Sequence, residues 1–62
     1  MPSPILKFFE YHHLPADLQY VAQQFHFLAQ NLDAQVMDSE EKEMGFRKLL
    51  EAKDCMVRAA LS

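Results

Sequence analysis

Several residue types that support familiar functions are scarce in this 62-residue sequence. Cys55 is the only cysteine, so no disulfide can form within the chain, and no Cys/His spacing suits structural zinc. Gly45 is the only glycine, which excludes a glycine-rich loop that cradles phosphate groups. No run of about 18 apolar residues occurs, so we expect no transmembrane helix and no membrane partner.

Basic residues are also few, and the formal net charge is −3. A general nucleic-acid binder normally carries a basic patch, so we expect no DNA or RNA polymer as a partner. The lone free thiol and the lack of an apolar leader favour a cytoplasmic protein. So short a chain offers little concave volume shielded from water, and we therefore expect no enzyme activity and no cofactor.

The small size itself predicts association with other chains. A single core below roughly 70 residues rarely supplies more than about 3–5 kcal/mol of folding stability, and small proteins usually add disulfides, metals or partners. With disulfides and zinc excluded, self-association is the remaining source of stability. We therefore expect a homo-oligomer.

Hydrophobic spacing and helix-start signals predict an all-α fold in a single domain spanning residues 1–62. A short N-terminal helix covers about residues 4–10, and an antiparallel hairpin follows, with helices over about 15–36 and 39–61. Pro15 suits the start of the first long helix. Asp38 or Ser39 suits the cap of the second, where acidic residues follow in the first turn.

The helix over 15–36 is apolar on two sides. Tyr20, Phe27 and Ala34 lie nearly opposite the main apolar face. They are either single exposed side chains, which are normal on surfaces, or a contact with another chain, and the small size favours the contact. Ala22 and Ala29 flank the main face and would allow a neighbour to approach closely. The main face, predicted to pack inside the hairpin, consists of Leu18, Val21, Phe25, Leu28 and Leu32.

The last helix also has a predicted apolar face. Cys55 precedes apolar Met56 and Val57, so we expect the thiol to be buried and inert. The face consists of Phe46, Leu49, Leu50, Met56, Val57, Ala60 and Leu61.

The histidines do not have the spacing of a metal site. His12 and His13 are adjacent, and His26 lies mid-helix without a histidine or carboxylate three or four residues away on its face. Tyr11, in the loop, offers a ring that either stacks on a flat ligand or packs on the end of the hairpin. We predict no metal ligands, and we keep these side chains as candidates for ligand recognition.

Three basic residues of the last helix are candidates for contact with phosphate: Lys48, Lys53 and Arg58. Alternatively, they are solvated side chains next to Glu51 and Asp54, as charged residues on a helix usually are.

The segment Tyr11-x-His13-Leu14-Pro15, together with residues 46–61, resembles a family of small phage proteins. These are the cyclic-nucleotide sponges that defeat CBASS and Thoeris-type immunity in bacteria. The resemblance implies a short helix and a helical hairpin assembled into a homohexamer in the cytoplasm of the infected host. It also implies binding of cyclic di- and trinucleotide messengers without cleavage.

The resemblance assigns roles to individual residues. It implies that Tyr11 stacks on a nucleobase and that His26, where the family usually has lysine, reaches phosphate. We add His12 or His13 as a further candidate for contact with phosphate. It places Arg58 at a separate trinucleotide pocket, and Lys48 completes the ligand-binding set that we predict. The alternative hypothesis is a helical-hairpin module that binds another protein and no small molecule.

Overall fold

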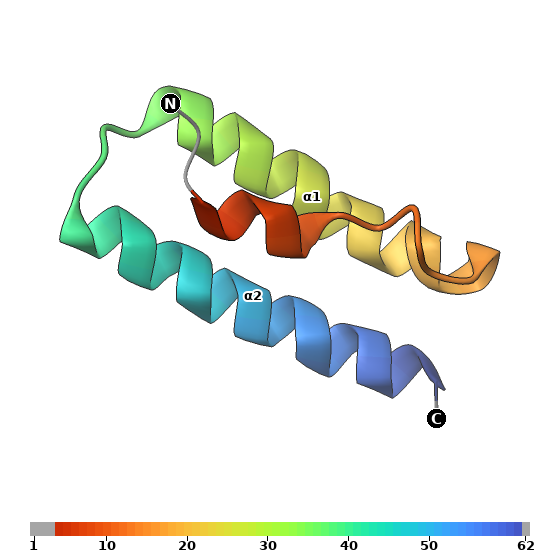
Figure 1. Ribbon diagram of the computed structural model, residues 1–62. Helices are drawn as coiled ribbons and strands as arrows, with labels where there is room; N and C mark the ends of the chain where they lie inside the picture. The colour runs from red at the N-terminus through yellow and green to blue at the C-terminus, as the bar shows by residue number, and fades with distance from the viewer. Residues whose placement is uncertain (1–3, 62) are drawn as a thin grey trace.

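The computed structural model describes residues 4–61, and these residues form helices and no strand. A 3-10 helix, η1, covers Pro4–Phe9, and two α-helices follow, α1 over Ala16–Gln35 and α2 over Glu40–Leu61. Figure 1 shows α1 and α2 side by side in opposite directions. The predicted all-α class is confirmed. No helix end lies more than one residue from its predicted position.

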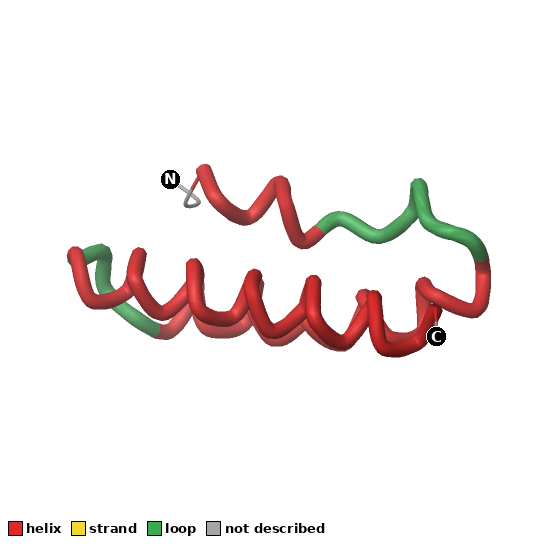
Figure 2. The backbone as a smooth tube through the Cα atoms, turned by 90° about the horizontal axis from the view of Figure 1, so that it is seen from below, coloured by secondary structure: helices red, strands yellow, loops and turns green. Residues whose placement is uncertain are grey.

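The elements form two layers. Figure 2 shows η1 and the following loop on one face of the α1–α2 hairpin, and no described element lies over the opposite face. Within residues 4–61, no helix has the length and hydrophobicity needed to cross a membrane.

A small apolar core lies where η1 meets the hairpin. Phe9 and Ala29 have no exposed surface, and Phe46 is almost completely buried. The Phe9 and Phe46 rings meet edge to face with centroids 6.3 Å apart, and Ile5 and Leu6 of η1 pack against the same cluster. The N-terminal segment therefore completes the core that the two long helices begin.

The predicted packing face of α1 was partly wrong. Leu18 is buried as expected, but Leu28 and Leu32 are 46% and 36% exposed. Ala22 and Ala29, expected at the edge of the face, are completely buried. The small alanine side chains allow close approach of the neighbouring elements, and this turns the buried side of α1 toward η1.

The predicted face of α2 also needs correction. Phe46 is buried, but Met56 and Leu61 are exposed, and so is Cys55, which we expected to be buried. Two lysines occupy buried positions instead, Lys42 and Lys53. A lysine can do so because its apolar stem packs against the core while its amine reaches polar groups at the edge.

Lys42 joins the end of α1 to the start of α2. Its Nζ donates hydrogen bonds to the carbonyl oxygens of Asp33 (3.1 Å) and Val36 (2.7 Å), and it forms ion pairs with the carboxylates of Asp33 (3.0 Å) and Asp38 (2.9 Å). No basic residue lies in the last turn of α1, so Lys42 supplies the cation that favours a helix C-terminus. The predicted serine cap of α2 is present, since the Lys42 backbone N–H donates to Ser39 Oγ at 3.1 Å.

The ion pair at this corner changes two pKa values. The hydrogen bond from Lys42, together with its positive charge, lowers the pKa of Asp38. The hydrogen bond to Asp38, with a further contribution from Asp33, raises the pKa of Lys42 against the opposing effect of burial. Both shifts favour the charged forms, so the corner is held by opposite charges at neutral pH.

Candidate functional site

The loop between η1 and α1 is fixed at both ends. Just before the loop, in the last turn of η1, the carbonyl oxygen of Phe8 accepts a 2.6 Å hydrogen bond from Lys53 Nζ of α2. At its end, Gln19 Nε2 of α1 donates to the carbonyl oxygens of Leu14 (2.8 Å) and His12 (3.4 Å). These side chains satisfy carbonyl groups that a loop cannot pair within itself, so they determine where the loop residues lie.

Four rings meet at this loop and form what we call the aromatic cluster: Tyr11, His12, His26 and Phe27. The Tyr11 ring lies 4.3 Å from the ring of His12 and 5.1 Å from that of His26, measured between centroids. Phe27 completes the cluster, 5.3 Å from His26 and 6.2 Å from Tyr11. The contacts of Tyr11 with His26 and of His26 with Phe27 are edge-to-face, an arrangement that aromatic rings favour.

The rings of the cluster differ in their exposure. His12 and Phe27 are exposed, whereas Tyr11 and His26 are half-buried. Nδ1 of His26 is shielded from solvent and has no hydrogen-bond partner among the described residues. A buried polar atom without a partner is uncommon in proteins, and a bound ligand is one way to satisfy it.

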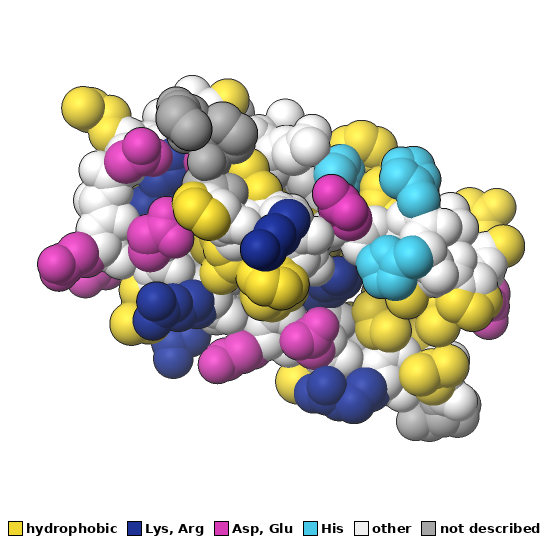
Figure 3. Space-filling view, viewed as in Figure 1, with side chains coloured by type: hydrophobic (Ala, Val, Ile, Leu, Met, Phe, Trp, Pro, Cys, Tyr) yellow, Lys and Arg dark blue, Asp and Glu magenta, His cyan; other side chains and the backbone are white. Residues whose placement is uncertain are grey.

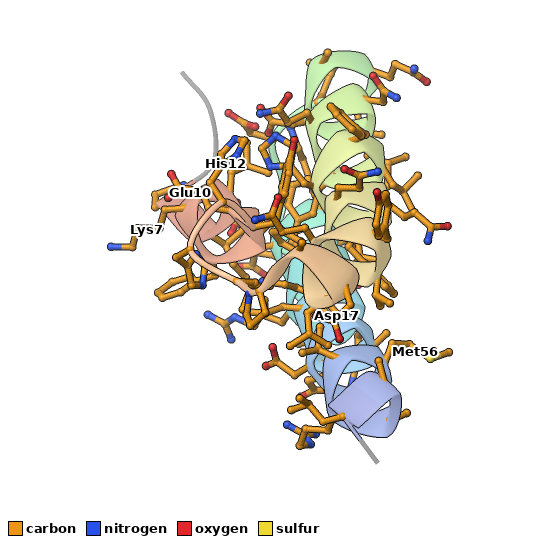
Figure 4. The ribbon with its side chains drawn as sticks, turned by 90° about the vertical axis from the view of Figure 1, so that its right-hand side faces the viewer. Lys7, Glu10, His12, Asp17 and Met56 are labelled. Atoms are coloured by element: carbon orange, nitrogen blue, oxygen red, sulfur yellow. The ribbon has the colours of Figure 1, made fainter. Side chains whose placement is uncertain are left out.

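An acidic residue lies close to the histidines. Glu10 lies beside His12 in Figure 4, and Figure 3 shows an acidic side chain among the histidines on this face. Its negative charge opposes the binding of an anion. The cluster therefore suits a ligand that combines a flat ring with phosphate better than a free phosphate ion.

Arg58 belongs to a different part of the surface. It lines a hollow of about 210 Å³ together with His13, Leu14, Lys53, Asp54 and Val57, and its Nη2 lies 3.4 Å from Cys55 Sγ. Lys48 is exposed on α2, ten residues before Arg58. That separation corresponds to about 15 Å along a helix, so one protomer does not bring Lys48 and Arg58 to the same site.

The structure thus brings together three of the predicted ligand-binding residues, Tyr11, His12 and His26. Within the protomer, the Tyr11 ring packs against His26 of α1 and is half-buried, and its stacking on a flat ligand stays a prediction. Sequence reasoning missed Phe27 as a member of this cluster and placed it with Tyr20 on a partner-binding arc. It also missed the role of Lys53, whose amine is occupied by the Phe8 carbonyl oxygen and is only slightly exposed.

Residues 4–61 contain no group of three or more histidine, cysteine, aspartate or glutamate side chains that could hold a metal ion. The fold and the cluster define a small helical-hairpin protein with an aromatic, histidine-containing surface. No family model, curated protein or solved structure matches the chain.

Proposed function

We propose that this protein is a phage sponge that binds cyclic oligonucleotide immune signals and sequesters them without cleavage. It would act against CBASS-type defence in the cytoplasm of the infected bacterium. The observation that carries the proposal is the contact between Tyr11 and His26. They lie fifteen positions apart in the sequence and on different elements, yet their ring centroids are 5.1 Å apart.

The chemistry of the two side chains matches the two parts of such a ligand. An aromatic ring stacks on a nucleobase with about 1–3 kcal/mol, whichever base is present. A neutral imidazole offers one N–H donor to a phosphate oxygen, and a protonated imidazole offers two. In the proposed complex, Tyr11 contacts the base, while His26 and His12 contact phosphate.

Self-assembly belongs to this proposal. A cyclic dinucleotide carries two bases and two phosphates with approximate two-fold symmetry, so two copies of the cluster related by a two-fold axis would match it. The homohexamer implied by the sequence resemblance would provide such pairs. Arg58 would serve a second anion site, for trinucleotides, and Lys48 of a neighbouring copy would add positive charge.

Isothermal titration of the purified protein with cyclic di- and trinucleotides tests the proposal. We expect saturable binding of at least one ligand, which is then recovered intact by chromatography. Replacing Tyr11 with alanine should weaken dinucleotide binding by roughly 5- to 150-fold, which corresponds to the loss of one stacking contact. Tyr20→Ala is the matched control, because Tyr20 is 70% exposed and outside the cluster. Absence of binding to every ligand at micromolar protein would refute the proposal.

The exposed ring of Tyr20 supports a second candidate function, a helical module that binds another protein. Under this alternative, Tyr20→Ala abolishes binding of a protein partner and Tyr11→Ala does not. A melting temperature that rises with cyclic nucleotide favours the sponge. A melting temperature that responds only to a protein favours the module.

A further inference from the structure

One face of the hairpin is apolar and has no described element over it. Figure 2 shows that no described element lies over the side of the hairpin opposite η1. Two hollows run along it, one of about 430 Å³ lined by Val21, Gln24, Phe25, Leu28 and Met56. The other, of about 240 Å³, is lined by Leu32, Val36, Lys42, Gly45, Phe46 and Leu49. We call this surface the bare face.

Helix geometry separates the bare face from the aromatic cluster. Gln19 and His26 contact the loop. Val21 lies two positions after Gln19, Leu28 lies two positions after His26, and both line a hollow of the bare face. Two positions on an α-helix correspond to about 160° around its axis. A partner on the bare face would therefore leave Tyr11 and His26 accessible.

The residue spacing on the bare face is that of helices that pack against further helices. On α1, apolar residues recur at steps of four, three and four: Val21, Phe25, Leu28 and Leu32. The seam on α2 follows the same steps with a further step of three: Gly45, Leu49, Ala52, Met56 and Ala59. These are coiled-coil spacings, which place each seam along a neighbouring helix.

The two seams are complementary in size. The seam of α1 consists of large side chains, whereas every second position on α2 is glycine or alanine. A Cβ atom added at Gly45 would meet nothing within 4 Å, so there is open space beside the backbone here. If a second hairpin turns its α1 over this α2, large side chains meet small ones at both symmetry-related contacts.

Charge also suits an identical partner. α1 has no lysine or arginine, and its carboxylates are those of Asp17 and Asp33. Asp33 is paired with Lys42. Gln24 lies beside the α1 seam and can donate and accept hydrogen bonds. α1 therefore brings few charged side chains to its contact with the partner's α2, and depletion of charge is typical of interface cores.

The exposed area is consistent with a missing partner. The chain exposes 4636 Å², whereas a compact monomer of its mass exposes about 4100 Å². The Cα trace measures 35 × 17 × 15 Å, so its broad side covers on the order of 600 Å² in projection before side chains are added, near the roughly 800 Å² that each partner buries in a standard interface.

We propose that the bare face pairs with the same face of a second copy, so that two hairpins form a four-helix bundle. This inference rests on the self-association in the proposed function and does not depend on the ligand. In the bundle, Leu28 and Leu32 lie over the small residues of the partner's α2, and the aromatic clusters lie on the two outer surfaces.

Sedimentation velocity and light scattering of the full chain test this pairing. We expect the wild-type mass to be an even multiple of 7.2 kDa at micromolar concentration. Leu28→Gln and Gly45→Arg should each lower the mass at least twofold, with helical circular dichroism retained. Gly45→Arg covers the case in which Leu28→Gln does not fold, because the space beside Gly45 accepts a side chain in a single copy. Glu51→Gln, at an exposed position of α2 outside the bare face, is the control and should keep the wild-type mass.

A monomeric wild type, or a Gly45→Arg variant with the wild-type mass, would overturn this interface. Dissociation of the Glu51→Gln control would also overturn it, because Glu51 lies outside the bare face. Ligand titration of the same samples separates the two proposals. A monomer that binds a cyclic dinucleotide overturns the interface alone, and an even-numbered assembly that binds none overturns the proposed function alone.

Discussion

Replacing Lys53 with methionine tests how the loop that carries Tyr11 is held. The Lys53 amine on α2 donates a 2.6 Å hydrogen bond to the Phe8 carbonyl oxygen, 45 residues away in the sequence. The lysine is 6% exposed, so water replaces the lost donor poorly. Methionine keeps an apolar stem of similar length and removes only the charged donor.

The expected loss follows from the chemistry of this bond. A hydrogen bond to a charged group contributes about 1.5–3 kcal/mol, and the variant leaves the Phe8 carbonyl oxygen without this partner. In a domain of this size, each kcal/mol corresponds to about 4–8 °C in melting temperature. We therefore expect Lys53→Met to melt roughly 6–24 °C below the wild type.

Thermal unfolding followed by circular dichroism at one fixed protein concentration measures this change. Lys48→Met is the matched control, since Lys48 is an exposed lysine on the same helix and its loss should change the unfolding free energy by less than about 0.5 kcal/mol. If Lys53→Met melts within the error of Lys48→Met, the bond to η1 does not stabilise the fold, and our account of how the loop is positioned is incorrect.

Two further predictions concern packing and pH. Ala29→Leu should destabilise the fold by about 1–3 kcal/mol in urea unfolding, because Ala29 has no exposed surface. Ala34→Leu, at an exposed position of α1, should not, and equal effects would contradict the assigned core. The lowered pKa of Asp38 stabilises the fold above the ordinary carboxyl pKa of 3.8, and this stabilisation is lost as the pH falls through the lowered value. Asp38→Asn should therefore be less stable than the wild type at pH 7, and the difference should disappear in strong acid. A difference that persists there would exclude the charge of Asp38 as its cause.

Local sequence signals were sufficient to predict the helices. Hydrophobic steps of three and four, the helix start near Pro15 and the Ser39 cap each depend on residues within one or two turns. Such signals survive in any tertiary arrangement, so the predicted bounds of α1 and α2 agree with the structure to within a residue. The spacing of hydrophobic residues does not distinguish a 3-10 helix from an α-helix over six residues, and η1 was predicted only as a helix.

The identity of the buried side could not be read from hydrophobicity alone. Leu28 and Leu32 are more apolar than Ala22 and Ala29, yet the alanines are buried and the leucines are exposed. Lys53 is buried because its amine reaches the carbonyl oxygen of Phe8, 45 residues away, and Lys42 because its amine reaches the carbonyl oxygen of Val36 across the turn between the helices. A one-dimensional pattern contains no information on those partners.

The sequence also predicted only a part of the candidate site. Tyr11, His12 and His26 were identified from residue type and from the family resemblance, and the tertiary structure determines that their rings meet and that Phe27 joins them. The order of the residues determined three helices, their ends and the presence of apolar residues on more than one side of α1, because these features depend on neighbours in the chain. Only the packing of η1 onto the hairpin determined which face is covered and which is bare, because that choice depends on the fit between segments far apart in the sequence.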